Sequence, residues 1–194
     1  MSATCLLYYR GHMTEVSFTQ MKDGTQADYE FLAQLEDDHI RGLPDRVLKA
    51  LEGLSDGLAG YKIDRLQHSL QTATRAEDEG ASIDWIVAAL VHDIGDELAP
   101  LSHSEFAAAL LKPFVSKEIV WVIEKHGLFQ AYYYAHHVGG DRHARNKYKD
   151  HPSYDRCVHF CEAWDQASFD PSYPTRSLDY FEPMVREVFS RRAH

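Results

Sequence analysis

The stretch that decides the fold is Ala88-Ala89-Leu90-Val91-His92-Asp93-Ile94-Gly95-Asp96. Apolar residues cover most of its circumference, which predicts a central, buried helix that begins at about Ser82. Gly95 stands where a helix usually stops, so His92 and Asp93 are expected at the helix end. A buried carboxylate beside a buried imidazole is costly unless something compensates both, and a metal ion does so. The alternative is a hydrogen-bonded core histidine beside an aspartate that acts as a local cap.

Composition predicts one ordinary globular domain over residues 1–194. The net charge of −10, with histidine counted as neutral, argues against nucleic acid or an anionic membrane surface as the main partner. A small anionic or zwitterionic molecule remains a suitable ligand, because local Arg and Lys can outweigh the global sign. The expected assembly is a monomer or a homodimer.

The sequence predicts a cytoplasmic protein. No apolar run is long enough to span a bilayer, and no basic segment followed by an apolar one marks a signal peptide at the N-terminus. Cys157 and Cys161 lie one helical turn apart, and we expect them to be buried thiols in a reducing compartment.

Helical periodicity recurs along the chain and no strand pattern is found, which predicts an all-α protein. Residues 1–25 show no clear period and are expected to form an irregular arm or a short strand. A capping box is expected at Ser102 and Glu105, and Gly127 is expected to end a helix just after His126. The predicted helices cover residues 25–38, 44–57, 64–80, 82–95, 102–113, 116–127, 129–137, 152–168 and 177–191.

Six side chains stand near apolar helix faces or helix ends and could act as metal ligands. Each alone is more often a hydrogen-bonded core residue or a surface residue, but together they suffice for two first-row metal ions. Asp93 can bridge the ions, because a carboxylate has two oxygens, and coordination positions would stay open for substrate. The six are His68, His92, Asp93, His103, His126 and Asp165.

These six residues, in the order H…HD…H…H…D, resemble the HD-domain superfamily from about His68 to Asp165. The resemblance implies a helical bundle whose metal-site core covers about residues 61–170. It also implies that one metal is held by His68, His92, Asp93 and Asp165. A second would be held by His103 and His126, which share Asp93 with the first.

Most members of this superfamily are phosphohydrolases, and a smaller branch consists of mixed-valent diiron oxygenases. That branch includes myo-inositol oxygenase and the oxygenases that cleave the C–P bond of 2-amino-1-hydroxyethylphosphonate and of its trimethylated analogue. His68-Ser69-Leu70-Gln71, the placement of His103 ten residues after Asp93, and Ala163-Trp164-Asp165 resemble the phosphonate oxygenases.

The resemblance implies two iron ions, Fe(II) and Fe(III), with O2 as co-substrate. The implied substrate is a small 1-hydroxyphosphonate such as 1-hydroxy-2-(trimethylammonio)ethylphosphonate, and the products are phosphate and an aldehyde or acid. The ligand set alone does not separate this reaction from that of a metal-dependent phosphohydrolase acting on a nucleotide or another small phosphate ester. A non-catalytic module that has kept the metal site is a third alternative.

Three positions depart from the aminohydroxyethylphosphonate enzyme and are candidate substrate contacts. Asp96 replaces a His, Gln130 a Lys and Glu162 an Arg. The loop after the predicted helix over residues 129–137 offers other cations for an oxyanion, namely Arg142, Arg145 and Lys147. The alternative for this loop is a solvated turn.

Aromatic residues give a second indication of the substrate. Tyr133 and Tyr134, with Glu162 or Asp96 nearby, could bind a quaternary ammonium group. The alternative is ordinary helix packing, and the three consecutive tyrosines 132–134 cannot all face one pocket. By resemblance, Tyr29-Glu30 or Tyr61 could guard the open metal, although helix packing and a solvated carboxylate are the favoured explanation of that pair.

Overall fold

The structure, a computed structural model, describes residues 14–192, and these are helical with no strand. The predicted all-α class is confirmed. The predicted arm lies partly outside the described residues, and its described part, residues 14–25, holds bends and the short η1. The helices are η1 (Met21–Asp23), α2 (Gln26–Arg41), α3 (Leu43–Gly53), η2 (Leu54–Asp56), α4 (Arg65–Asp78), α5 (Ile83–Val91), α6 (His103–Leu111), α7 (Lys117–Tyr134), η3 (Ala135–Val138), η4 (Ala144–Tyr148), α8 (Tyr154–His159), η5 (Phe160–Asp165) and α9 (Leu178–Phe189).

The chain divides between Leu43 and Pro44 into two compact units. The first contains α2, which begins with a capping box between Thr25 and Asp28. The second holds all the other long helices and the predicted metal ligands. That residues 1–194 form a single domain stays a prediction.

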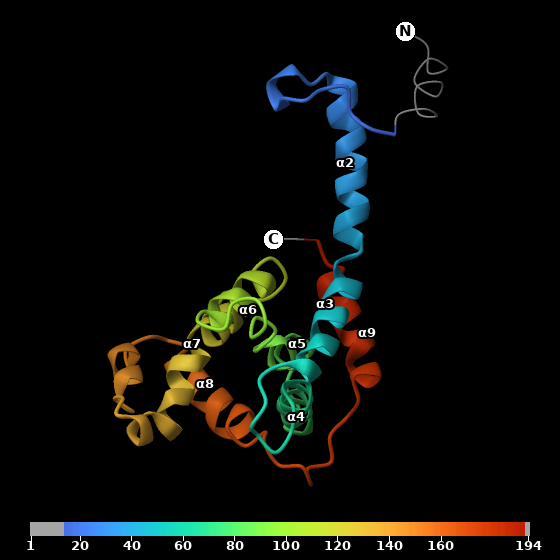
Figure 1. The fold of residues 1–194 in the computed structure, drawn as a ribbon. Helices are drawn as coiled ribbons and strands as arrows, with labels where there is room; N and C mark the ends of the chain where they lie inside the picture. The colour runs from blue at the N-terminus through green and yellow to red at the C-terminus, as the bar shows by residue number, and fades with distance from the viewer. Residues whose placement is uncertain (1–13, 193–194) are drawn as a thin grey trace. The chain divides into compact units, whose positions relative to one another are not determined.

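The larger unit is organised around α5, whose residues from Ile86 to Val91 are all buried. The helix α5 packs against α4 and α9, and α6 packs against α7 (Figure 1). Helix α7 in turn contacts α8 and η5, which brings the end of η5 toward the centre of the bundle. The buried free thiols Cys157 and Cys161 lie on this segment. Among the described residues, no helix combines the length and apolar character needed to cross a membrane.

Gly95 does not end a helix, and the prediction that α5 continues to it is wrong. Helix α5 ends at Val91, and His92 and Asp93 lie in the turn that follows. A methyl group at residue 95 would come within 2.9 Å of the Cα atom of His103. Glycine is present because the first turn of α6 approaches the backbone here, and not because the chain needs a helix terminator.

Gly127 does not end a helix either, because α7 runs without interruption from Lys117 to Tyr134. The residues predicted as two helices, 116–127 and 129–137, are therefore one long helix and the short η3. A methyl group at residue 127 would lie 2.8 Å from Ser104 Oγ, so this glycine also allows α6 to come close. The predicted capping box at the start of α6 is likewise absent, since the Ser102 side chain makes no capping hydrogen bond.

The predicted helix over residues 152–168 is built from two different segments. An α-helical turn, α8, is followed by the π-helix η5, which ends at Asp165. Short π-helical segments insert an extra residue per turn and are frequent at functional sites. Asp165 is buried at the end of η5, a segment that contacts both α4 and α7.

Within the smaller unit, Asp28 is buried and accepts hydrogen bonds from Thr25 Oγ1 (2.6 Å) and from the backbone N–H of Ser17 (2.7 Å). The hydroxyl of Thr25 and the backbone N–H groups of Ser17 and Thr25 hold the pKa of the Asp28 carboxyl well below its usual range. A carboxylate with a lowered folded pKa stabilises the fold above its unfolded pKa of about 3.9, and this stabilisation is lost as the pH falls through the folded value.

We predict that Asp28→Asn accelerates amide hydrogen exchange along α2 about five-fold at pH 7, the effect of losing a typical helix cap. The difference from the wild type narrows at pH 3, because the Asp28 carboxyl of the unfolded segment is then mostly protonated while the folded one keeps its charge. The matched control is Asp37→Asn, an exposed position of the same helix. Equal exchange rates in the two variants at pH 7 would contradict this account of the cap.

Candidate metal centre

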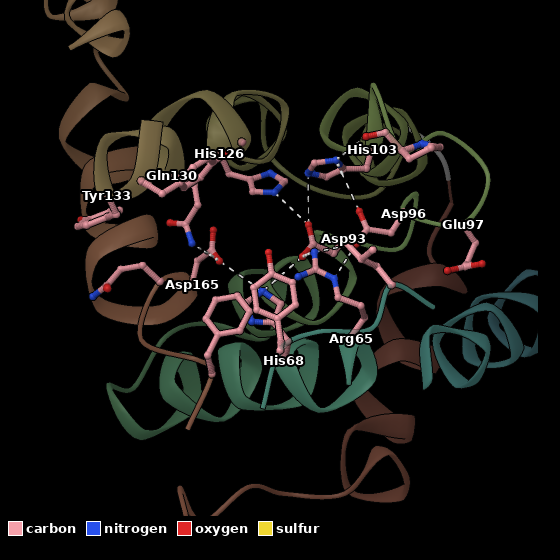
Figure 2. Close-up of a pocket in the computed structure, with 17 residues that line it drawn as sticks. Arg65, His68, Asp93, Asp96, Glu97, His103, His126, Gln130, Tyr133 and Asp165 are labelled. Atoms are coloured by element: carbon pink, nitrogen blue, oxygen red, sulfur yellow. Dashed lines mark hydrogen bonds and ion pairs between the residues drawn. The ribbon is translucent and has the colours of Figure 1, made fainter. Parts of the chain in front are cut away.

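The structure brings all six predicted ligands to one place from five separate segments. His68 comes from α4, His92 and Asp93 from the turn after α5, His103 from the first residue of α6, His126 from α7 and Asp165 from the end of η5. Five of the six are buried, and the His103 side chain retains 26% of its exposure. Figure 2 shows Asp93 between His103 and His126 on one side and Arg65 on the other.

Three imidazoles are oriented by backbone carbonyl groups. The Nδ1–H groups donate to carbonyl oxygens of Ser168 (2.8 Å, from His68), Ala89 (2.8 Å, from His92) and Ile123 (2.6 Å, from His126). A carbonyl oxygen only accepts, so the proton of each neutral ring is on Nδ1 and the lone pair is on Nε2. Such outer hydrogen bonds are typical of metal-binding histidines.

Four donor atoms gather at a first candidate ion position. His68 Nε2 lies 3.1 Å from His92 Nε2, 3.3 Å from Asp93 Oδ2 and 3.4 Å from Asp165 Oδ1. Ligands about 2.1 Å from a shared ion lie roughly 3.0–3.4 Å apart in octahedral or tetrahedral arrangements. His68, His92 and Asp93 therefore lie close enough together for a single first-row ion, and Asp165 lies beside His68 and groups with His92 and His126.

The other oxygen of Asp93 faces a second candidate position. Asp93 Oδ1 lies 3.3 Å from His126 Nε2 and 3.4 Å from His103 Nε2. The carboxylate thus presents one oxygen to each position, as a bridging ligand does. Three groups of donors in the described chain could hold an ion: His68, His92 and Asp93; His92, His126 and Asp165; and Asp93, His103 and His126.

The centre is arranged to receive positive charge. Two Nε2 lone pairs that face each other at 3.1 Å repel unless a proton or a metal ion lies between them. Burial alone would lower the pKa of His92, but the charge of Asp93 and contacts with Asp165 outweigh it and raise this pKa to about 10. The buried Asp165 Oδ2 has no hydrogen-bond partner. The residues therefore fit a divalent metal ion.

A cavity of about 530 Å³ opens onto this centre. Its walls are rich in aromatic side chains, and its charged residues outside the ligand set are Arg65, Asp96 and Glu97. It is lined by Leu58, Tyr61, Arg65, His68, Asp93, Asp96, Glu97, Pro100, His103, His126, Gly127, Gln130, Tyr133, Tyr134, Asp165, Gln166 and Phe169.

Sequence reasoning missed Arg65. Its guanidinium pairs with Asp93 Oδ2 (2.5 Å) and with Asp96 Oδ2 (2.7 Å), and it is the only Arg or Lys among the cavity-lining residues described. Arg65 precedes His68 by three residues on α4, so the two share a helix face. That spacing was a usable signal. Asp96, proposed to face a substrate cation, is instead paired with this guanidinium at its Oδ2 atom.

Several predicted substrate contacts lie at the cavity. Tyr133, Tyr134, Gln130 and Asp96 line it, and Gln130 Nε2 donates to Asp165 Oδ1 (3.0 Å). The amide oxygen of Gln130 is buried without a partner. Gln130 therefore both supports a ligand and offers an acceptor.

The predicted oxyanion clamp does not reach this cavity. The guanidinium groups of Arg142 and Arg145 lie over the Tyr132 ring, 4.3 and 3.8 Å from its centroid. Lys147 lies 5.1 Å from the Tyr148 centroid and lines a separate cavity, and Glu162 is exposed. The three basic side chains lie against aromatic rings, and the Glu162 side chain is exposed. None of the four lines the cavity beside the six ligands.

The proposed guard residues Tyr29 and Glu30 belong to the smaller unit. Tyr29 stacks on Phe18, and Glu30 accepts a hydrogen bond from Gln26. Tyr61, the other candidate, lines the cavity and stacks on Phe169 with ring centroids 4.9 Å apart. Tyr61 therefore lies at the site, and the guard role of Tyr29-Glu30 stays a prediction.

Comparison with known proteins gives one family. Residues 65–165, just over half of the chain, match the family described as HD domain. The match begins at Arg65 and ends at Asp165, so it includes all six candidate ligands. No curated protein matches the chain.

We predict that Mn²⁺, Fe²⁺ or Zn²⁺ raises the melting temperature of the metal-free protein. A free ion at 100 times its Kd stabilises the fold by about 2.7 kcal/mol. Asp165→Asn keeps the shape of the side chain but removes the charge, and the shift is expected to shrink strongly. His136→Ala, an exposed histidine outside the centre, is the control. An equal shift in both variants would contradict the assignment of Asp165.

Proposed function

The chain belongs to the HD-domain family, whose members are generally metal-dependent enzymes, and from this premise we propose that it is a diiron oxygenase. In this proposal the six ligands hold an Fe(II)/Fe(III) pair, and O2 is the co-substrate. The substrate is a small 1-hydroxyphosphonate that carries a cationic group, with 1-hydroxy-2-(trimethylammonio)ethylphosphonate as the first candidate. C–P cleavage releases phosphate and an aldehyde or acid.

The observation that carries the proposal is the inequality of the two ion positions. The donors at the first, from His68, His92 and Asp93 with Asp165 beside them, are all buried. The second has three protein donors, and one of them, His103, is partly exposed and lines the cavity. Both positions face the cavity, which His68, Asp93, Asp165, His103 and His126 line, and the second position, with its partly exposed ligand, leaves more room for a small molecule at the ion.

The cavity also supports a zwitterionic substrate. Aromatic faces attract quaternary ammonium groups, and Tyr61, Tyr133, Tyr134 and Phe169 line the cavity. Glu97, an exposed carboxylate that forms no ion pair within residues 14–192, adds negative charge at the same cavity. The guanidinium of Arg65 is already paired with two carboxylates, which leaves little free cationic charge for a polyphosphate.

The bound ions would supply Lewis acidity toward the substrate oxygens and the electron needed to activate O2. The chain supplies the rest. Backbone carbonyls fix the rings of His68, His92 and His126, and Gln130 holds Asp165 in place.

A metal-dependent phosphohydrolase remains the second candidate, because the family match and the paired ion positions serve it equally. In that case the open position would hold water that attacks a nucleotide or another small phosphate ester. The two candidates differ in one directly measurable quantity, which is oxygen consumption.

We predict that the iron-loaded protein consumes O2 and releases phosphate from 1-hydroxy-2-(trimethylammonio)ethylphosphonate, and releases none when oxygen is excluded. His103→Ala is expected to lower the rate by at least ~100-fold, because losing a ligand costs more than losing an outer hydrogen bond. His136→Ala is the control. Phosphate release from phosphate esters without oxygen consumption would instead establish the hydrolase.

A further inference from the structure

His103 is the least firmly anchored of the four imidazoles. Its Nδ1 lies 3.5 Å from the Pro100 carbonyl oxygen, whereas the corresponding contacts of the other three rings measure 2.6 to 2.8 Å. Its other polar neighbour on that side, Asp96 Oδ1, is 3.6 Å away. The Ser102 side chain does not cap the helix that begins here. Hydrogen bonds therefore do little to fix this ring, and packing must do more.

Two glycines on different segments allow that close packing. Gly95 lies in the turn after α5, and Gly127 lies within α7. A methyl group at residue 95 would lie 2.9 Å from His103 Cα and 2.9 Å from Phe106 Cβ. A methyl group at residue 127 would lie 2.8 Å from Ser104 Oγ and 3.6 Å from His103 Nε2. Both contacts fall on the first turn of α6.

The backbone does not require glycine at either position. Gly95 and Gly127 are not among the glycines with positive φ, which are Gly60, Gly80 and Gly139. Alanine forms helices better than glycine, so the interior of α7 would favour alanine at 127 if space were free. The lack of room for a side chain is therefore the reason for glycine at both positions.

We propose that Gly95 and Gly127 form a glycine clasp that positions His103 and so determines whether the second ion is bound. The inference rests on the proposed two-ion function and deepens it. The two glycines are positioning residues that act through the first turn of α6. The nearest atoms that the added methyl groups would meet belong to α6 and not to His68, His92 or Asp165, so the first ion position is expected to be affected less than the second.

The test is the number of iron ions retained per chain after dialysis, together with the affinity for the second ion. The wild type is expected to hold two, and Gly95→Ala and Gly127→Ala about one, with second-ion affinity weakened roughly 10–100-fold. Gly53→Ala is the matched control, because a methyl group there would meet nothing within 4 Å. It is expected to hold two.

A rescue variant separates the clasp from general damage. Ser104→Ala removes the hydroxyl that the methyl group of Gly127→Ala would meet, so the double variant is expected to regain the second ion. This comparison also decides the case if Gly127→Ala alone does not fold. Two tightly held ions in Gly127→Ala, or a folded double variant that still holds one, would overturn the proposal.

A separate readout keeps the clasp distinct from the proposed function. In metal-free protein, the backbone amide resonances of Ser104 and Phe106 are expected to shift in Gly127→Ala and to return in the double variant. A wild type that holds a single ion contradicts the two-ion function, and the clasp is then judged on these resonances. Unchanged resonances in Gly127→Ala would overturn it.

Discussion

Four electron-rich atoms crowd together in the centre of the bundle, and the rest of the structure depends on what holds them there. His68 Nε2 and His92 Nε2 face each other at 3.1 Å, and Asp93 Oδ2 and Asp165 Oδ1 lie 3.3 and 3.4 Å from the first of them. No apolar core gains from such an arrangement, because buried charges and unpaired lone pairs are costly. A cation between these atoms is attracted by all of them, so the arrangement that is costly without an ion favours binding of the ion. The helices α4 and α5 and the π-helix η5 keep the atoms in place.

The carboxylate of Asp93 divides the centre into two unequal halves. One oxygen faces the buried position, and the other faces His103 and His126 beside the cavity. Arg65 pairs with the same carboxylate and with Asp96, so the shared ligand is also tied to the cavity wall. The second position has a partly exposed ligand in His103, and this inequality is the feature on which the proposed catalysis rests. The family match is consistent with it but names no substrate.

The ligands could be anticipated from the sequence, and their surroundings largely could not. Each of the six combines a polar side chain with an apolar helix face or a helix end, which is a local signal. Gly95 and Gly127 were misread as helix ends, because a glycine needed for close approach looks the same in a sequence as one that ends a helix. Arg142 and Arg145 were misplaced because the rings that hold them depend on tertiary folding. Arg65 has a local signal in the sequence, because it stands three residues before His68 and therefore on the same face of α4.

Electron paramagnetic resonance of iron-loaded protein, partly reduced in the absence of oxygen, tests the central claim most directly. If Asp93 bridges two iron ions, their spins couple, and the account predicts a mixed-valent signal whose mean g value lies below that of a free electron. Adding the hydroxyphosphonate should change this signal, because the proposed substrate binds at the iron pair. A spectrum of isolated ferric ions, in protein that has taken up iron, would contradict the bridged pair.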